Sequence, residues 1–149
     1  MQDFVHLHVH TQYSLLDGQA SVARLVDKAM KNGMKGIAVT DHGNMFGIKE
    51  FTNYVNKKNS GPKGEVKDLK KRIAGIEAGT IECEDKEAEI AACKAKIVEA
   101  ENKLFKPIIG CEMYVARRTM DLKEGKPDQS GYHLIVLAKN ETGYHNLIK

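Results

Sequence analysis

The N-terminal segment of this chain alternates aromatic or branched residues with histidines. Residues 4–9 read Phe-Val-His-Leu-His-Val, and a third histidine follows at position 10. A period of two predicts a β-strand that carries His6, His8 and His10 on one face. A single histidine on a core strand is usually a satisfied polar group, but burying three imidazoles without partners would cost on the order of 1–3 kcal/mol each. Three in register therefore favour a shared metal ion, because neutral imidazole is a good ligand for zinc, iron and manganese.

The chain on either side of residues 57–105 alternates strand and helix patterns. Apolar residues at helical spacing after Ser21 predict a helix that ends near Gly33. An uninterrupted apolar run at 37–39 predicts a strand buried on both faces, followed by a helix over about 46–56. Residues 106–115 and 132–138 predict two further strands, and 142–149 a helix. This alternation predicts an α/β fold.

Residues 57–105 differ in composition. Ten basic and ten acidic residues lie between positions 63 and 106, and apolar residues keep a heptad-like spacing on both sides of a turn at 79–85. We expect two helices folded back as a hairpin, inserted into the α/β domain formed by residues 1–149. The zero net charge of residues 63–106 argues against a nucleic-acid clamp. A solvated surface insertion is the first interpretation and a partner-docking arm the second.

Composition excludes several classes of protein. With 149 residues, 42% of them hydrophobic and 29% charged, the chain is neither disordered nor membrane-embedded. Its N-terminus lacks a basic stretch, so no signal peptide is expected. Three cysteines without a Cys-x-x-Cys pair fit a reduced, cytoplasmic setting. The pI of 8.7 is below that of a dedicated nucleic-acid-binding domain.

Further candidate residues lie at predicted strand ends. Thr-Asp-His-Gly follows the strand at 37–39, and functional residues of parallel α/β folds gather at such ends, so His42 is expected on the same rim as His10. A turn-capping Asp41 and a solvated His42 are the competing interpretation. Glu112 lies inside an apolar strand, where a buried carboxylate must be paired or metal-bound, unless it faces solvent at an edge. The histidine that begins the strand at 132–138, His133, allows the same two interpretations.

Together, these motifs resemble a known superfamily. His-x-His-Thr with Asp-Gly seven residues later, Thr-Asp-His-Gly and Gly-Cys-Glu are similar to the polymerase-and-histidinol-phosphatase (PHP) superfamily. The longer strings Ala-Val-Thr-Asp-His-Gly-Asn-Met-Phe-Gly and Pro-Ile-Ile-Gly-Cys-Glu-Met-Tyr-Val resemble the N-terminal region of bacterial replicative polymerase (DNA polymerase III) alpha subunits. The resemblance covers residues 1–56 and 106–149 and leaves the charged segment outside the general pattern.

The resemblance implies a distorted (β/α)7 barrel, truncated here after about four strands, with up to three zinc or manganese ions at its rim. His8 and His10 would bind a first metal, and Glu112 would bridge it to a second, which His133 also binds. Asp17 and His42 would hold a third. His6 and Asp41 would support these ligands from behind. The family's later ligands fall beyond Lys149, so the chain alone is expected to bind metal weakly or partly.

The implied function is DNA replication. The chain would be part of a magnesium-dependent DNA-directed DNA polymerase, a nucleotidyltransferase, in which the complete PHP domain stabilises the large subunit and hydrolyses phosphoesters, as in a proofreading exonuclease. Its partners would be the rest of the alpha subunit, a proofreading exonuclease subunit, other replisome components and, through the full-length protein, DNA, with no membrane. The fragment alone is expected to be inactive. The alternatives are a free-standing phosphoesterase, acting on a monoester such as histidinol phosphate, and a non-catalytic scaffold held by metal.

Overall fold

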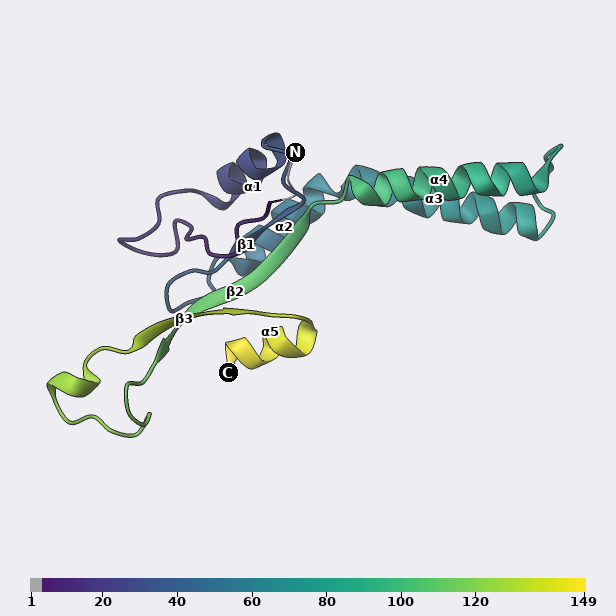
Figure 1. The fold of residues 1–149 in the computed structure, drawn as a ribbon. Coiled ribbons are helices and arrows are strands. Elements are labelled where there is room, and N and C mark those ends of the chain that lie inside the picture. The colour runs from purple at the N-terminus through teal and green to yellow at the C-terminus, as the bar shows by residue number, and fades with distance from the viewer. Residues whose placement is uncertain (1–3) are drawn as a thin grey trace. The chain divides into compact units, whose positions relative to one another are not determined.

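The computed structural model describes residues 4–149, which contain five α-helices and a three-stranded sheet (Figure 1). The chain divides into two compact units. The first comprises residues 4–55 and 106–149, and the second is residues 56–105. The expected α/β class is confirmed. No helix in the described part of the chain is long and apolar enough to cross a membrane.

The first unit is built on a mixed sheet of order β1-β2-β3. Its strands are β1 (Gly36–Val39), β2 (Lys106–Val115) and β3 (Tyr132–Leu137). β1 and β2 are parallel, with Gly36 opposite Lys106. A Cβ on Gly36 would lie 2.5 Å from the Lys106 carbonyl oxygen, so glycine permits this approach. β3 runs antiparallel to β2, with Tyr114 opposite His133.

The strand predicted at residues 4–9 is wrong, because no strand is assigned there. The segment still runs beside β1: the amide of Ala38 donates to the carbonyl of His6 and that of Thr40 to the carbonyl of Val9, each at 2.9 Å. His6 and Val9 are three positions apart, whereas Ala38 and Thr40 are two positions apart. This extra residue breaks the register and with it the period-two alternation.

Three helices lie where the sequence predicts helices. They are α1 (Val22–Lys31), α2 (Ile48–Lys58) and α5 (Glu141–Ile148), and a short 3-10 helix lies at Lys126–Asp128. α1 buries Val22, Val26 and Ala29, which share one helical face. It ends before Gly33, whose φ of 78° lies in the left-handed region that favours glycine.

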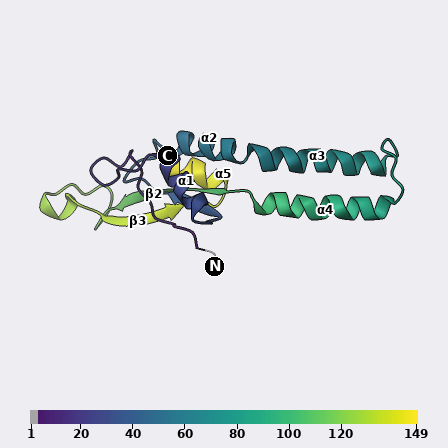
Figure 2. The same ribbon diagram turned by 90° about the horizontal axis from the view of Figure 1, so that it is seen from above.

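The second unit is a helical hairpin. α3 (Ser60–Glu77) and α4 (Lys86–Asn102) lie side by side and antiparallel (Figures 1 and 2). Ile76 from α3 and Cys93 and Ala100 from α4 are buried, and all three belong to the predicted apolar stripes. The side chain of Asp85 caps α4 by accepting a 3.0 Å hydrogen bond from the amide of Ala88.

The side chain of Asn59 joins the two ends of the hairpin. Asn59, which is 4% exposed, donates through Nδ2 to the carbonyl of Phe105 at 2.8 Å. Its Oδ1 accepts from the amide of the same residue at 2.9 Å. Asn59 therefore satisfies both backbone groups of a buried residue 46 positions away.

Candidate metal centre

Six polar side chains converge in the first unit, from the irregular segment, the loop before α1, the end of β1 and the two longer strands. They are His8, His10, Asp17, His42, Glu112 and His133. Because β3 runs antiparallel to β2, the start of β3 lies beside the C-terminal part of β2. This pairing brings His133 to the end of the sheet where the other five lie.

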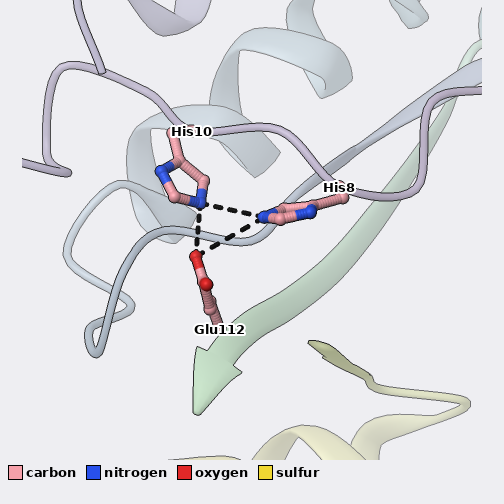
Figure 3. A group of neighbouring side chains, drawn as sticks. All are labelled: His8, His10 and Glu112. Carbon is pink, nitrogen blue, oxygen red and sulfur yellow. Dashed lines mark hydrogen bonds and ion pairs between the residues drawn. The ribbon is translucent and has the colours of Figure 1, made fainter. Parts of the chain in front are cut away.

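Glu112 is the hub of this arrangement. Its Oε2 lies 2.6 Å from Nε2 of His10 and 3.4 Å from Nε2 of His8, and its Oε1 lies 2.6 Å from Nδ1 of His133. Figure 3 shows the His8 and His10 rings and the carboxylate directed at one another, with 3.0 Å between the two Nε2 atoms. Three side chains thus direct ligand atoms toward a common point.

His42 extends the cluster on the other side. Its Nδ1 lies 2.7 Å from Oδ2 of Asp17 and 3.8 Å from Oε2 of Glu112. Its Nε2 makes a close contact with the phenol oxygen of Tyr114. Both ring nitrogens of His42 therefore have polar neighbours, which define the orientation of the ring.

The ligand atoms form three overlapping groups, each spanning no more than 4.8 Å. The groups are His8, His10 and Glu112; His10, Asp17 and His42; and His42, Glu112 and His133. His10, His42 and Glu112 each belong to two of them. Such sharing is what adjacent ions need, since a common ligand holds two ions close together.

The residues fit a metal ion by a direct structural test. Glu112 is 6% exposed, and within residues 4–149 its Oε2 is buried without a hydrogen-bond partner. The approach of His10 to this oxygen is short but lacks hydrogen-bond geometry. A buried unpaired carboxylate oxygen is costly. A cation between imidazole nitrogens and this oxygen would satisfy it, and such a mixed donor set suits zinc or manganese.

The protonation of Glu112 agrees with a ligand role. Burial raises the pKa of its carboxyl, but contacts with His133, His10 and His8 outweigh burial, so that the pKa lies below its ordinary value. Glu112 is therefore ionised at neutral pH and presents acceptor oxygens only.

Asp41 anchors the loop that carries Asp17. It is 1% exposed and accepts from the amide of Thr11 at 2.6 Å, the hydroxyl of Thr11 at 2.8 Å and the hydroxyl of Ser14 at 2.7 Å. Ser14 Oγ in turn accepts from the amide of His42 at 3.0 Å. Asp41 therefore ties the segment after His10 to the end of β1 without entering any of the three groups.

The same loop depends on a close backbone approach. A Cβ on Gly18 would lie 1.9 Å from the carbonyl oxygen of Thr11, so only glycine fits next to Asp17. Leu16 has a φ of 76°, which costs a non-glycine residue of order 1–3 kcal/mol. Compact turns on both sides thus direct Asp17 toward His42.

His6 is not brought to the cluster. Its ring packs edge-to-face on Phe4, with the centroids 4.8 Å apart, and it lines a separate hollow with Val9 and Leu25. The lost register between residues 6 and 9 accounts for this, because it uncouples the side-chain direction of His6 from that of His8 and His10.

Some site residues escaped the sequence reasoning. Tyr114 follows Glu112 by two positions on β2, so strand periodicity alone places both on one face. Thr11 and Ser14 read as ordinary turn residues, yet they are 0% and 1% exposed. The signal available was a Thr-x-x-Ser pair directly after a histidine cluster, near enough to share one acceptor.

Comparison with known proteins assigns the chain to a family. The PHP domain family matches residues 6–149. DNA polymerase III subunit alpha of Treponema pallidum is 40% identical over 146 residues and that of Borreliella burgdorferi 40% identical over 149 residues, and the Aquifex aeolicus protein is 32% identical over 154 residues. These alignments cover 97%, 98% and 99% of this chain but only 9% of each relative. The chain thus spans less than a tenth of the length of the relatives it matches.

Both resemblances inferred from the motifs are therefore confirmed. Since the family match covers nearly the whole chain, this chain belongs to the PHP domain family.

Proposed function

We propose that the chain is the PHP region of a DNA polymerase III alpha subunit and that its cluster binds divalent metal ions for phosphoester hydrolysis. The observation that carries this proposal is the convergence of four imidazoles and two carboxylates in three groups that share ligands. The relatives, named DNA polymerase III subunit alpha, support the polymerase context. The partners proposed are the rest of the alpha subunit, a proofreading exonuclease subunit, replisome components and DNA.

The shared ligands suggest which residues hold which ion. His8 and His10 would bind a first zinc or manganese ion, and Glu112 would bridge it to a second, to which His133 also binds. Asp17 and His42 would hold a third. The short separations within each group support this assignment.

Bound ions would supply a water of lowered pKa and positive charge for the phosphate oxygens. The chain's own residues prepare the site. Glu112 stays ionised and points into the cluster. Asp17 and Nδ1 of His42, which lie 2.7 Å apart, would face an ion held between them, and Nε2–H of that ring would then donate to the phenol oxygen of Tyr114. This contact gives Tyr114 a defined orientation beside the cluster.

We also propose that the sheet is part of a distorted (β/α)7 barrel. β3 is an edge strand of the described sheet and carries no proline or lysine. An apolar edge of this kind is usually paired with or covered by another segment. A further strand paired with the free edge of β3 would extend the sheet, as closure into a barrel requires.

Calorimetric titration of the metal-free chain with Zn2+ and Mn2+ tests the proposal. We expect binding that His10→Ala weakens by about tenfold or more. His145→Ala, which removes an exposed histidine of α5, should leave the binding unchanged. Because the chain is expected to hold the ions incompletely, tight binding of three ions would contradict that expectation. Equal affinity of wild type and His10→Ala would contradict the site itself.

Hydrolysis of bis(p-nitrophenyl) phosphate separates a catalytic from a structural centre. The same two variants are compared in the full-length alpha subunit, with folding followed by circular dichroism. Loss of hydrolysis in His10→Ala with the fold retained supports catalysis. If the wild type binds metal but does not hydrolyse the ester, and the variant unfolds, the centre is a structural metal site and not a catalytic one.

A further inference from the structure

The charges of the α3–α4 hairpin are balanced in number but not in position. Residues 56–72 and 94–105, here called the stem, contain ten basic and four acidic residues. Residues 73–93, the tip, contain one basic and six acidic residues. The near-zero net charge of this unit therefore conceals a basic stem and an acidic tip.

The basic residues of α3 are also concentrated on one side. Four exposed lysines at positions 63, 67, 70 and 71 fall within roughly 100° of arc on a helix of 3.6 residues per turn. Glu65 falls on the opposite side of the same helix, and Asp68 lies outside this arc, about 60° beyond Lys71. The lysines follow one another over about 12 Å of helix length.

Two ion pairs identify the faces of the hairpin. Lys70 Nζ lies 3.8 Å from Oε1 of Glu101, and Arg72 Nη2 lies 2.8 Å from Oε1 of Glu89. Each ion pair crosses from one helix to the other beside their shared interface. Lys70 and Glu101 therefore lie on one face of the hairpin, and Arg72 and Glu89 lie on the other. Helical periodicity then adds Lys94 to the face of Lys70.

We define the lysine face as Lys63, Lys67, Lys70, Lys71 and Lys94. Glu101 is the acidic residue of the stem on this side, and its pair with Lys70 is long and exposed on both partners, so it contributes little. The opposite face of the stem has nearly equal numbers of acids and bases. The hairpin is therefore polarised across its width as well as along its length.

Rows of cations with few counter-charges fit a ligand with regularly spaced anions. The sole aromatic residue of 56–105 is Phe105, and it is buried, so this face has no ring on which a base could stack. The acidic tip repels phosphates and confines contact to the stem. Duplex DNA held through its backbone satisfies these conditions, because phosphate contacts require cations but no base stacking.

We propose that the lysine face binds the phosphate backbone of duplex DNA without reading its sequence. The binding uses none of the residues of the metal cluster, so it goes beyond phosphoester hydrolysis and does not depend on it. The DNA polymerase relatives favour DNA over RNA as the duplex.

The test is fluorescence anisotropy of the whole 149-residue chain with a labelled 20-base-pair duplex, in EDTA so that no metal-dependent contact contributes. For about five phosphate contacts, the logarithm of the binding constant should fall with the logarithm of salt concentration with a slope of about −4.5. The variant K63E/K67E/K71E should weaken binding at least tenfold at low salt and reduce the slope by about 3.

The matched control is K86E/K96E/K103E, which changes the formal charge equally. Lys86 lies in the tip, and Lys96 and Lys103 lie in the stem but off the lysine face. We expect it to keep its affinity within about threefold of the wild type. If the charge-reversal variant does not fold, K63Q/K67Q/K71Q removes the same three charges without introducing repulsion.

Three results would overturn the proposal: equal loss of affinity in both triple variants, no binding by the wild type, or binding without a salt slope. Self-association of the chain that K63E/K67E/K71E abolishes, without DNA binding, would assign the face to the acidic tip of a second copy instead.

Discussion

Replacing Asp41 by alanine should destabilise the first unit strongly. The substitution removes three hydrogen bonds to a buried carboxylate, two from Thr11 and one from Ser14. Hydrogen bonds to charged groups contribute about 1.5–3 kcal/mol each. The two hydroxyls can rotate toward other acceptors, but the amide of Thr11 remains fixed and unpaired. We therefore expect the free energy of unfolding to fall by about 3–5 kcal/mol, a large part of the 5–15 kcal/mol typical of a domain.

Tyrosine fluorescence during urea titration measures this unit selectively. The chain has no tryptophan, and its five tyrosines (positions 13, 54, 114, 132 and 144) all lie in the first unit. The hairpin therefore contributes no signal. Asp41→Asn keeps the shape and one acceptor oxygen, and we expect it to cost less than half as much as Asp41→Ala.

The control is Asp121→Ala, at an exposed loop position, which should change stability by no more than about 0.5 kcal/mol. A loss below about 1 kcal/mol for Asp41→Ala would refute the reasoning, because three buried bonds cannot be removed so cheaply. Equal losses for Asp41→Ala and Asp121→Ala would refute it as well.

Three further predictions concern other parts of the first unit. Gly18→Ala would place a Cβ 1.9 Å from a backbone carbonyl oxygen, so we expect a loss of more than about 2 kcal/mol in the same urea titration, and an unchanged midpoint would contradict this. His10 belongs to two of the metal-binding groups and His8 to one. His10→Ala should therefore weaken zinc binding by about tenfold or more in calorimetry, a larger loss of affinity than His8→Ala causes. A larger loss in His8→Ala would argue against the shared-ligand arrangement. The hydrogen bond from Arg118 lowers the pKa of Asp128 below its ordinary 3.8. The pKa of Asp128 is then lower in the folded state than in the unfolded state. The ionised carboxylate therefore stabilises the fold at pH values above the unfolded pKa, and this stabilisation is lost as the pH falls through the folded pKa. The difference in Tm between wild type and Asp128→Asn should therefore be present at about pH 6 and shrink progressively as the pH falls below 3.8. A difference independent of pH would show that Asp128 acts otherwise.

The elements with strong local patterns could be predicted from the sequence. The strand at 106–115 has the predicted bounds, and the apolar spacing on both sides of the turn at 79–85 predicted α3 and α4. Periodicity identifies such elements because one face must be buried whatever the neighbours are. It failed at residues 4–9, since a one-residue slip against β1 leaves the alternation in the sequence unchanged.

The direction of β3 and the contacts of the cluster depend on tertiary structure. Nothing in residues 132–138 distinguishes a parallel from an antiparallel strand, yet this direction decides where His133 lies. Asp17 and His42, 25 positions apart in the sequence, could be connected only through the family resemblance, and the structure places them 2.7 Å apart. Tyr114 was overlooked because a tyrosine at a strand end usually reads as a packing residue.

The bidentate contact of Asn59 with Phe105 has an evolutionary consequence. Because the hairpin begins and ends at one hydrogen-bonded pair, its length can change without altering the path of the chain outside it. A lineage could lengthen, shorten or lose the hairpin in one event, with the ancestral connection restored by a short turn. Homologous chains should therefore differ in length most often between these two positions, and an engineered deletion of residues 60–104 should be among the largest that the chain tolerates.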